Sequence, residues 1–191
     1  MWEFVDKVLY INLAKRTDRN EHMKKMTQVF GDKVIRVEAT EADPGYIGCT
    51  QSHIRCLEMA IENKWKNVLI LEDDSEWRDL DTNYSSVEKL ITQPYDVLLL
   101  CGGCINANNN KVVSSQTATA YLVNSSYYET LLANFKEGFQ KLLETNNYSV
   151  FAIDQYWKQL QSRDNWYITL PILIYQRPDY SDIEKRYVSY F

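Results

Sequence analysis

The chain has 191 residues, of which 45% are hydrophobic and 25% are charged. This length fits one compact α/β domain with a buried core, so we expect a single domain over residues 1–191. The formal net charge is −5 and the sequence contains no run of Lys and Arg, so we do not expect the protein to bind nucleic acid. The sequence also contains no apolar segment long enough to span a bilayer.

The first half of the chain alternates between apolar runs and helical patterns. The expected elements are, in chain order, a strand at 8–12, a helix at 18–30, a strand at 34–39, a turn at 43–45, a helix at 50–63 and a strand at 68–71. The last of these strands carries almost no polar residue, which is typical of a strand covered on both faces. It ends abruptly in Glu72-Asp73-Asp74.

The second half continues the alternation. Here we expect a helix at 85–92, a strand at 95–100, an edge or antiparallel strand at 117–123, a long helix at 125–143, a short helix at 152–160 and a strand at 167–175. The polar tail from residue 176 onward is predicted to be a loop. Together the elements predict a mostly parallel central sheet with helices on both faces.

Cys101-Gly102-Gly103-Cys104 has the spacing of a redox pair or of half a zinc site. A redox pair normally opens a helix, whereas asparagines that favour a loop follow this pair. A zinc knuckle needs a second pair, and Cys49 with Cys56 has the wrong separation. We therefore favour reduced thiols beside a strand end.

The acidic triplet Glu72-Asp73-Asp74 is the strongest chemical signal. Three successive carboxylates repel one another, and a bound cation or buried basic partners relieve that repulsion. Ligands of open α/β sheets bind beyond the carboxyl ends of the strands, where this triplet falls. Carboxylate oxygens favour magnesium or manganese, so the sequence predicts such a site; the alternative is a solvated acidic turn.

Three motifs in this order resemble glycosyltransferase family 25, which includes bacterial lipooligosaccharide galactosyltransferases and collagen hydroxylysine galactosyltransferases. They are Ile11-Asn12-Leu13 followed by Arg16, Asp18 and Arg19; Gly48-Cys49 followed by Ser52-His53; and Leu71-Glu72-Asp73-Asp74. Later segments fit as well: Thr119-Ala120-Tyr121-Leu122, Asp154-Gln155, and Gln176 with Ser181-Asp182-Ile183. The resemblance covers nearly the whole chain.

The resemblance implies a GT-A-type nucleotide-sugar fold and transfer of a hexose, galactose or glucose, from a UDP-sugar. It also implies inversion at the anomeric carbon, dependence on Mn²⁺ or Mg²⁺, and a glycan or glycosylated protein as acceptor. Asp74 corresponds to the best metal ligand. Glu72 would bind the metal, its water shell or the ribose, and Asp73 would lie in the donor site.

Asn12, Arg16 and Arg19 follow the first strand, where such folds hold the nucleotide. Arginine suits bidentate contact with diphosphate oxygens. The alternative is an exposed basic turn whose charges pair with Asp18 or Glu21. Thr40, after the second strand, is a weaker candidate for contact with the uridine.

Ser52 and His53 are expected in the first turn of the helix at 50–63, where free backbone N–H groups favour anions. His53 could donate to a phosphate or a sugar hydroxyl, or it could be a structural histidine, as we expect for His22. Trp77, just beyond the triplet, is a candidate for stacking against a sugar, whereas Trp157 is expected in the core.

An inverting transfer needs a general base for the acceptor hydroxyl. Asp154 is the candidate base because it matches the later Asp of the family, although it could instead cap the short helix. Asp182 is a rival base. Many GT-A enzymes take a further metal ligand from the carboxyl-terminal segment, often His, and here Gln176, Asp182 or water would have to supply it.

Two other functions stay open. The chain could be a catalytically silent nucleotide-sugar-binding module. A nucleotidyltransferase is less favoured because the Gly-rich, Lys-bearing loop that wraps a triphosphate is missing after Asn12. Residues 1–6 contain two acids and lack the apolar stretch of a signal peptide, so we expect a cytoplasmic location unless the chain is cut from a longer secretory-pathway protein.

Overall fold

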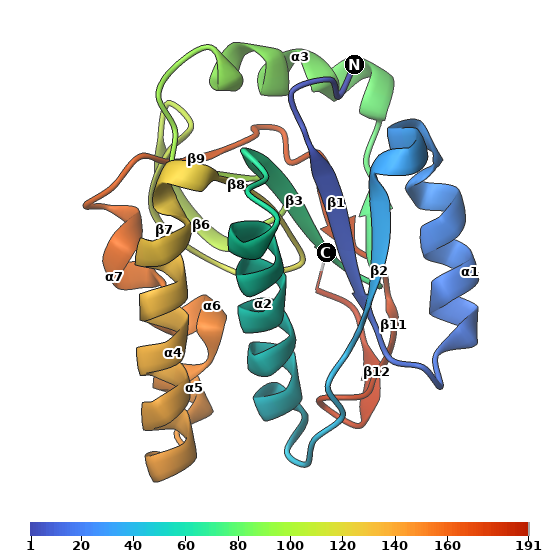
Figure 1. The fold of residues 1–191 in the computed structure, drawn as a ribbon, viewed down its shortest axis with the longest axis vertical. Helices are drawn as coiled ribbons and strands as arrows, with labels where there is room; N and C mark the ends of the chain where they lie inside the picture. Colours follow the sequence, from blue (N-terminus) through green and yellow to red (C-terminus); the bar gives the residue numbers. More distant parts are fainter. Residues whose placement is uncertain (191) are drawn as a thin grey trace.

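An eight-stranded sheet forms the centre of the computed structural model, which describes residues 1–190 without the side chains of residues 81 and 82 (Figure 1). Its strand order is β2-β1-β3-β8-β5-β9-β7-β6. The strands are β1 (Lys7–Asn12), β2 (Val34–Glu38), β3 (Asn67–Glu72), β5 (Val97–Leu99), β6 (Gly103–Asn108), β7 (Lys111–Gln116), β8 (Ala120–Asn124) and β9 (Trp166–Ile168). Only β7 and β8 run against the other strands of this sheet, which confirms the expected mostly parallel arrangement.

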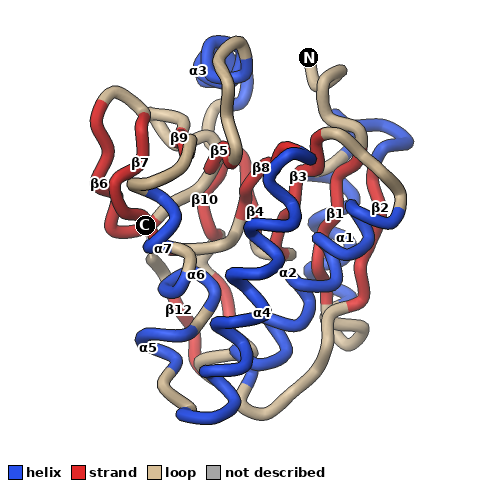
Figure 2. The backbone as a smooth tube through the Cα atoms, turned by 60° about the vertical axis from the view of Figure 1, so that its left-hand side comes forward, coloured by secondary structure: helices blue, strands red, loops and turns tan. Residues whose placement is uncertain are grey.

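Helices cover both faces of the sheet, as predicted. The helices on one face are α2 (Gly45–Glu62), α4 (Tyr128–Thr145), α6 (Ile153–Tyr156) and α7 (Lys158–Gln161), and those on the other are α1 (Thr17–Met26) and α3 (Leu80–Ile91). Figure 1 shows α2 and α4 side by side in front of the sheet, and Figure 2 shows α6 and α7 beside β7. The short helices η1 (Gln28–Lys33), η2 (Ser125–Tyr127) and α5 (Tyr148–Phe151) complete the helical elements of the described residues.

Alternating residues of the strands supply the two halves of the core. In β3, Val68 and Ile70 pack with α2 and α4, whereas Leu69 and Leu71 pack with α1 and α3. All four are fully buried, which explains the unbroken apolar run in the sequence. Trp157 is also fully buried, as expected.

The helix predicted at 50–63 begins a full turn earlier, at Gly45. Glycines at 45 and 48 lower the local helix propensity, which hid this first turn from the sequence. The placement of Ser52 and His53 in the first turn was therefore wrong, because both lie well inside α2 and away from its free N–H groups.

The asparagines after Cys104, which we expected to favour a loop, belong to the β6–β7 hairpin. Its turn residues Asn109 and Asn110 have φ of 47° and 71°, the left-handed conformation that asparagine tolerates and that two-residue hairpins favour. The strand near residue 120 is antiparallel as predicted, but it is not at an edge, because β8 lies between β3 and β5.

The carboxyl-terminal part also differs from the expectation. The single strand predicted at 167–175 is divided into β9 and β10 (Ile174–Gln176), with Pro171, which lacks a backbone N–H, between them. The tail predicted as a loop forms the hairpin of β11 (Asp179–Ser181) and β12 (Arg186–Val188). β10 pairs with β4 (Ser75–Trp77), which directly follows the acidic triplet.

Strand register brings distant polar residues to one end of the sheet. Ile11 pairs with Glu72 in the parallel β1–β3 ladder, so Asn12 lies beside Asp73. Figure 1 shows the β2–α2 loop and the β11–β12 hairpin at this same end. Among the described residues, no helix is both long and apolar enough to cross a membrane.

Gly48 provides a test of how α2 is fixed to this end of the sheet. A Cβ added at residue 48 would lie 2.1 Å from the carbonyl oxygen of Thr40. We expect Gly48→Ala to lower the free energy of unfolding by about 1–3 kcal/mol, because the backbone after β2 must move. Denaturant unfolding measures this, with Glu62→Ala at the exposed end of the same helix as control; equal stability of G48A and E62A would contradict the close approach.

Candidate active site

A cavity of about 150 Å³ opens beyond the carboxyl ends of β1, β2 and β3, between α2 and the β11–β12 hairpin. Most residues selected from the sequence line it. They are Arg19, Thr40, Ser52, His53, Glu72, Asp73, Asp74, Gln176 and Asp182. Asn12, Arg16 and Asp154, which were also selected, are not among the residues that line it.

Arg19 is the central cation of the site. Its Nη1 donates to Asp73 Oδ1 at 2.7 Å and to Asp74 Oδ2 at 3.2 Å, and its Nε donates to Asp179 Oδ2 at 3.0 Å. The side chain is buried, so these ion pairs are poorly screened by solvent. Arg19 therefore neutralises part of the acidic triplet from within the protein.

Asp74 keeps one carboxylate oxygen without a partner. Its Oδ2 accepts from Arg19 and, at 3.0 Å, from Gln176 Nε2, whereas Oδ1 is buried and has no hydrogen-bond partner among the described residues. Burial and the charge of Glu72 raise the pKa of Asp74 to about 7. An unpaired buried oxygen of this kind fits a cation ligand.

Asp73 is held on the other side of Arg19. Its Oδ2 accepts from Asn12 Nδ2 at 2.7 Å, and its Oδ1 accepts from Arg19. Burial raises the pKa of Asp73, and the two donors oppose that rise. Both oxygens are occupied, so Asp73 positions Arg19 and the start of the β1–α1 loop.

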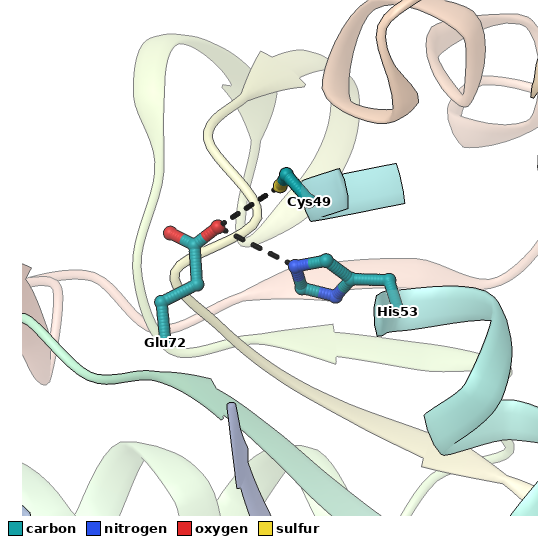
Figure 3. A group of neighbouring side chains, drawn as sticks. All are labelled: Cys49, His53 and Glu72. Carbon is teal, nitrogen blue, oxygen red and sulfur yellow. Dashed lines mark hydrogen bonds and ion pairs between the residues drawn. The ribbon is translucent and has the colours of Figure 1, made fainter. Parts of the chain in front are cut away.

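The side chain of Glu72 is directed toward Cys49 and His53 of α2 (Figure 3). Its Oε1 lies 3.4 Å from His53 Nε2 and 3.7 Å from Cys49 Sγ, and its Oε2 accepts from Thr119 Oγ1 at 2.9 Å. Burial opposes ionisation of Glu72, but His53 and Thr119 outweigh it and lower the pKa of the carboxyl. Glu72 is therefore a carboxylate whose oxygens contact hydrogen-bonding groups of His53, Cys49 and Thr119.

Arg16 contacts acidic residues of its own loop and of the β11–β12 hairpin. Arg16 Nη1 donates to Asp182 Oδ2 at 2.7 Å, and Arg16 Nη2 donates to Asp179 at 2.9 Å and to Asp18 at 2.8 Å. These pairs join the β1–α1 loop to the β11–β12 hairpin. A direct contact of Arg16 or Arg19 with a diphosphate stays a prediction, and it requires these pairs to be exchanged.

Ser52 and His53 are buried residues of α2 that shape the cavity wall through their hydrogen bonds. Ser52 Oγ donates to Gly48 O at 2.7 Å and accepts from the backbone N–H of Thr40 at 2.9 Å, which fixes Thr40 at the cavity. His53 is fully buried, and its Nδ1 lies 2.8 Å from the hydroxyl of Tyr121. Only the Nε2 side of this ring faces Glu72 and the cavity.

Asp154 does not cap its own short helix. Its Oδ2 accepts from the backbone N–H of Thr117 at 3.0 Å, and α6 has no side-chain cap. Burial raises the pKa of Asp154, and the charge of Glu72 adds to this rise. The carboxyl therefore fixes the segment that leads to Thr119.

Trp77 and His22 have structural positions. Trp77 packs against Trp2 and Phe30 and donates to Met26 O at 2.8 Å, so it is not on the cavity wall. His22 lies 2.8 Å from the carbonyl oxygen of Ser75, as a structural histidine does.

The Cys101–Cys104 segment is likewise structural. Cys101 is buried before β6, Cys104 is exposed within it, and both are free thiols. Cys101 lies shortly after the end of β5 and Cys104 near the start of β6.

The sequence did not reveal several residues that complete the site. Asp179 binds both arginines but lies in a tail predicted as a loop. Thr119, Tyr121 and Cys49 were parts of motifs without an assigned role, and Cys49 was otherwise considered only for zinc-knuckle spacing. The signal for Thr119 was its position just before β8, whose first residue, Ala120, pairs with Leu71 beside Glu72.

The family model of glycosyltransferase family 25, described as LPS biosynthesis protein, matches residues 38–152, more than half of the chain. The chain belongs to glycosyltransferase family 25. The matched residues include Thr40, the Cys49–His53 segment and the acidic triplet. Asn12, Arg16, Arg19, Asp154, Gln176 and Asp182 lie outside this match, so in this family 25 glycosyltransferase their assignment rests on the resemblance of the motifs and on geometry.

Two solved structures share the fold. One is a glycosyltransferase involved in the glycosylation of the major capsid of PBCV-1, with a TM-score of 0.55 and 12% identity, covering 89% of this chain and 92% of that chain. The other is A197 from STIV, with a TM-score of 0.53 and 11% identity, covering 95% and 93%. No curated protein matches the sequence. At such low identity the likeness concerns the fold alone.

The raised pKa of Asp74 makes a prediction about stability. Because its pKa of about 7 in the folded glycosyltransferase exceeds 3.8, folding favours the protonated carboxyl. Its contribution to stability is therefore full below about pH 4 and is lost as the pH rises to about 7. We expect Asp74→Asn, which is always neutral, to gain stability relative to the unmodified chain over this interval, by on the order of 1 kcal/mol or more.

Denaturant unfolding at about pH 4 and about pH 8 without divalent cations measures this difference. Asp32→Asn, at an exposed position, is the control and should show little change with pH. An Asp74→Asn difference that is flat with pH, or that reverses, would show that Asp74 is ionised throughout.

Proposed function

We propose that this glycosyltransferase moves galactose or glucose from a UDP-sugar to a glycan or glycosylated protein, with inversion at the anomeric carbon and with Mn²⁺ or Mg²⁺. The observation that carries the proposal is the unpartnered, buried Oδ1 of Asp74 in a cavity at the carboxyl ends of the strands. This is where α/β sheets bind nucleotides, and family membership supplies the transfer chemistry.

The residues present fit a hard divalent cation. Asp74 would hold it, with Glu72 as a second ligand or as the partner of the ribose, and Gln176 already orients Asp74 Oδ2 at 3.0 Å. When bound, such a cation neutralises the negative charge of the diphosphate leaving group.

Residues after β1 and β2 would bind the diphosphate and the uridine of the donor. Arg19 and Arg16 carry the positive charge that a diphosphate requires, and Asn12 fixes this loop through Asp73. Thr40 lines the wall next to the end of β2, in a position suited to the uridine. Binding of the donor would exchange arginine–carboxylate pairs for arginine–phosphate pairs.

Asp154 is the favoured general base. Its raised pKa makes it a stronger base than an ordinary carboxylate, and it makes no ion pair with the described residues. Asp182 is the rival, since it lines the cavity. However, Arg16 lies 2.7 Å and Lys15 3.5 Å from its carboxylate, and these ion pairs would have to open before the carboxylate could contact an acceptor.

Donor binding and turnover test the cation site. We expect one UDP-hexose, of a panel of nucleotide sugars, to bind in the presence of Mn²⁺ and to release UDP slowly, and EDTA to abolish both. Asp74→Asn should weaken Mn²⁺-dependent binding by roughly tenfold or more, or about 1.4 kcal/mol. Calorimetry and a UDP assay measure these effects.

Asp32→Asn serves as the control and should behave as the unmodified chain. Undiminished binding by Asp74→Asn would remove Asp74 from the metal site. Binding of a donor without release of UDP, with any acceptor, would support a silent module, and release of pyrophosphate would indicate a nucleotidyltransferase.

The base assignment has its own test. Asp154→Asn keeps an acceptor oxygen for the N–H of Thr117, so the fold and donor binding should persist. We expect kcat to fall by about 100-fold or more while the Kd of the UDP-sugar stays within about twofold. The same loss in Asp182→Asn with normal turnover in Asp154→Asn would assign the base to Asp182.

A further inference from the structure

Three potential metal ligands of different elements meet at one wall of the cavity. Cys49 and His53 lie four residues apart on α2 and therefore project from the same side of the helix. Glu72 reaches them from the end of β3, and Figure 3 shows the three side chains directed toward one another. Their ligand atoms all lie within 4.8 Å of one another.

Two of the distances between ligand atoms are those of a metal site. Glu72 Oε1 is 3.4 Å from His53 Nε2, longer than the roughly 2.7–2.9 Å of a strong bond from an N–H to a carboxylate, and it is 3.7 Å from Cys49 Sγ. In a tetrahedral zinc site, bond lengths of about 2.0–2.3 Å place nitrogen about 3.4 Å and sulfur about 3.6 Å from a carboxylate oxygen. The observed separations match those two edges.

The surroundings of His53 resemble the second shell of a metal site. Its Nδ1 lies 2.8 Å from the hydroxyl of Tyr121, and the two rings stack with centroids 5.7 Å apart. Both side chains are fully buried, so the ring orientation is fixed. A partner on the remote nitrogen is the usual device that holds Nε2 ready for a metal.

The remaining oxygen of Glu72 is fixed as well. Glu72 Oε2 accepts from Thr119 Oγ1 at 2.9 Å, which leaves Oε1 for the cluster. All three ligand residues line the cavity, so an ion has a path of entry and a free coordination position toward it.

We propose that Cys49, His53 and Glu72 form a site for a borderline or soft divalent cation, for which Zn²⁺ is the best fit. A sulfur, an imidazole nitrogen and one carboxylate oxygen are the ligands that zinc prefers, whereas Mn²⁺ and Mg²⁺ prefer oxygen alone. On binding, the S–H bond of Cys49 breaks, the metal–sulfur bond forms, and the proton passes to solvent.

This proposal does not rest on the proposed function. It assigns Glu72 to the cluster with Cys49 and His53, which leaves Asp74 as the ligand of the donor cation. Glu72 points toward α2, whereas the unpartnered oxygen belongs to Asp74. The cavity would therefore hold two cation sites, one at Asp74 that prefers Mn²⁺ or Mg²⁺ and one at Cys49 that prefers Zn²⁺. A zinc ion at the Cys49 site would hold Glu72 in place and narrow the space for a sugar nucleotide.

Cobalt(II) is the probe, because a thiolate ligand gives Co²⁺ a charge-transfer band in the near ultraviolet. We expect the metal-free full chain to develop this band with saturation at one equivalent of Co²⁺, and one equivalent of Zn²⁺ to abolish it. Cys49→Ser should remove the band, whereas Cys104→Ser, which changes an exposed thiol outside the cluster, should keep it. Asp74→Asn should also keep it.

The outcomes separate this site from sugar transfer, since no donor or acceptor is present. Absence of the band in the unmodified chain, its persistence in Cys49→Ser, or its loss in Cys104→Ser would overturn the proposal. Should Cys49→Ser fail to fold, X-ray absorption of the unmodified chain with one equivalent of Zn²⁺ decides the question. We expect one sulfur and otherwise nitrogen and oxygen ligands; two sulfurs, or none, would refute the site.

Discussion

The rest of the cavity depends on the ion pairs of Arg19 with the carboxylates after β3. Asp73 and Asp74 are buried, and two charges in such a place cost several kcal/mol each unless they are paired. Arg19 contacts both and also reaches Asp179 of the carboxyl-terminal hairpin. One buried guanidinium thus allows the acids to stay clustered where a cation and a diphosphate would later share their charge.

The same arginine explains how distant segments are held together. Asp179 and Asp182 bind Arg16, and Asp179 also binds Arg19, so the β11–β12 hairpin is attached to the β1–α1 loop by charge. Arg16 is only partly buried, so solvent screens its ion pairs more than those of Arg19. The hairpin therefore forms a wall of the cavity that is attached partly through exposed charges.

The three acids of the triplet have different environments although they are adjacent in sequence. Asp73 is saturated by Arg19 and Asn12, Asp74 keeps an oxygen free, and Glu72 lies with His53 and Thr119. These environments move the pKa of Asp74 up and that of Glu72 down. Adjacent carboxyl groups with different pKa values are suited to different roles. The acidic triplet in the sequence does not reveal this difference.

The sequence by itself determined the strands that carry the site, the two-sided burial of β3 and the family, because apolar periodicity and motif order are local properties of the chain. It also selected Asp74, Glu72 and Arg19. Only the tertiary structure decided that Arg19 binds Asp74, that Glu72 turns to Cys49, and that Asp179 completes the charge network. The contacts of Arg19 with Asp74 and Asp179 join residues 55 or more positions apart, and Glu72 and Cys49 are 23 positions apart. They depend on strand register and on the path of the tail, which no local pattern encodes.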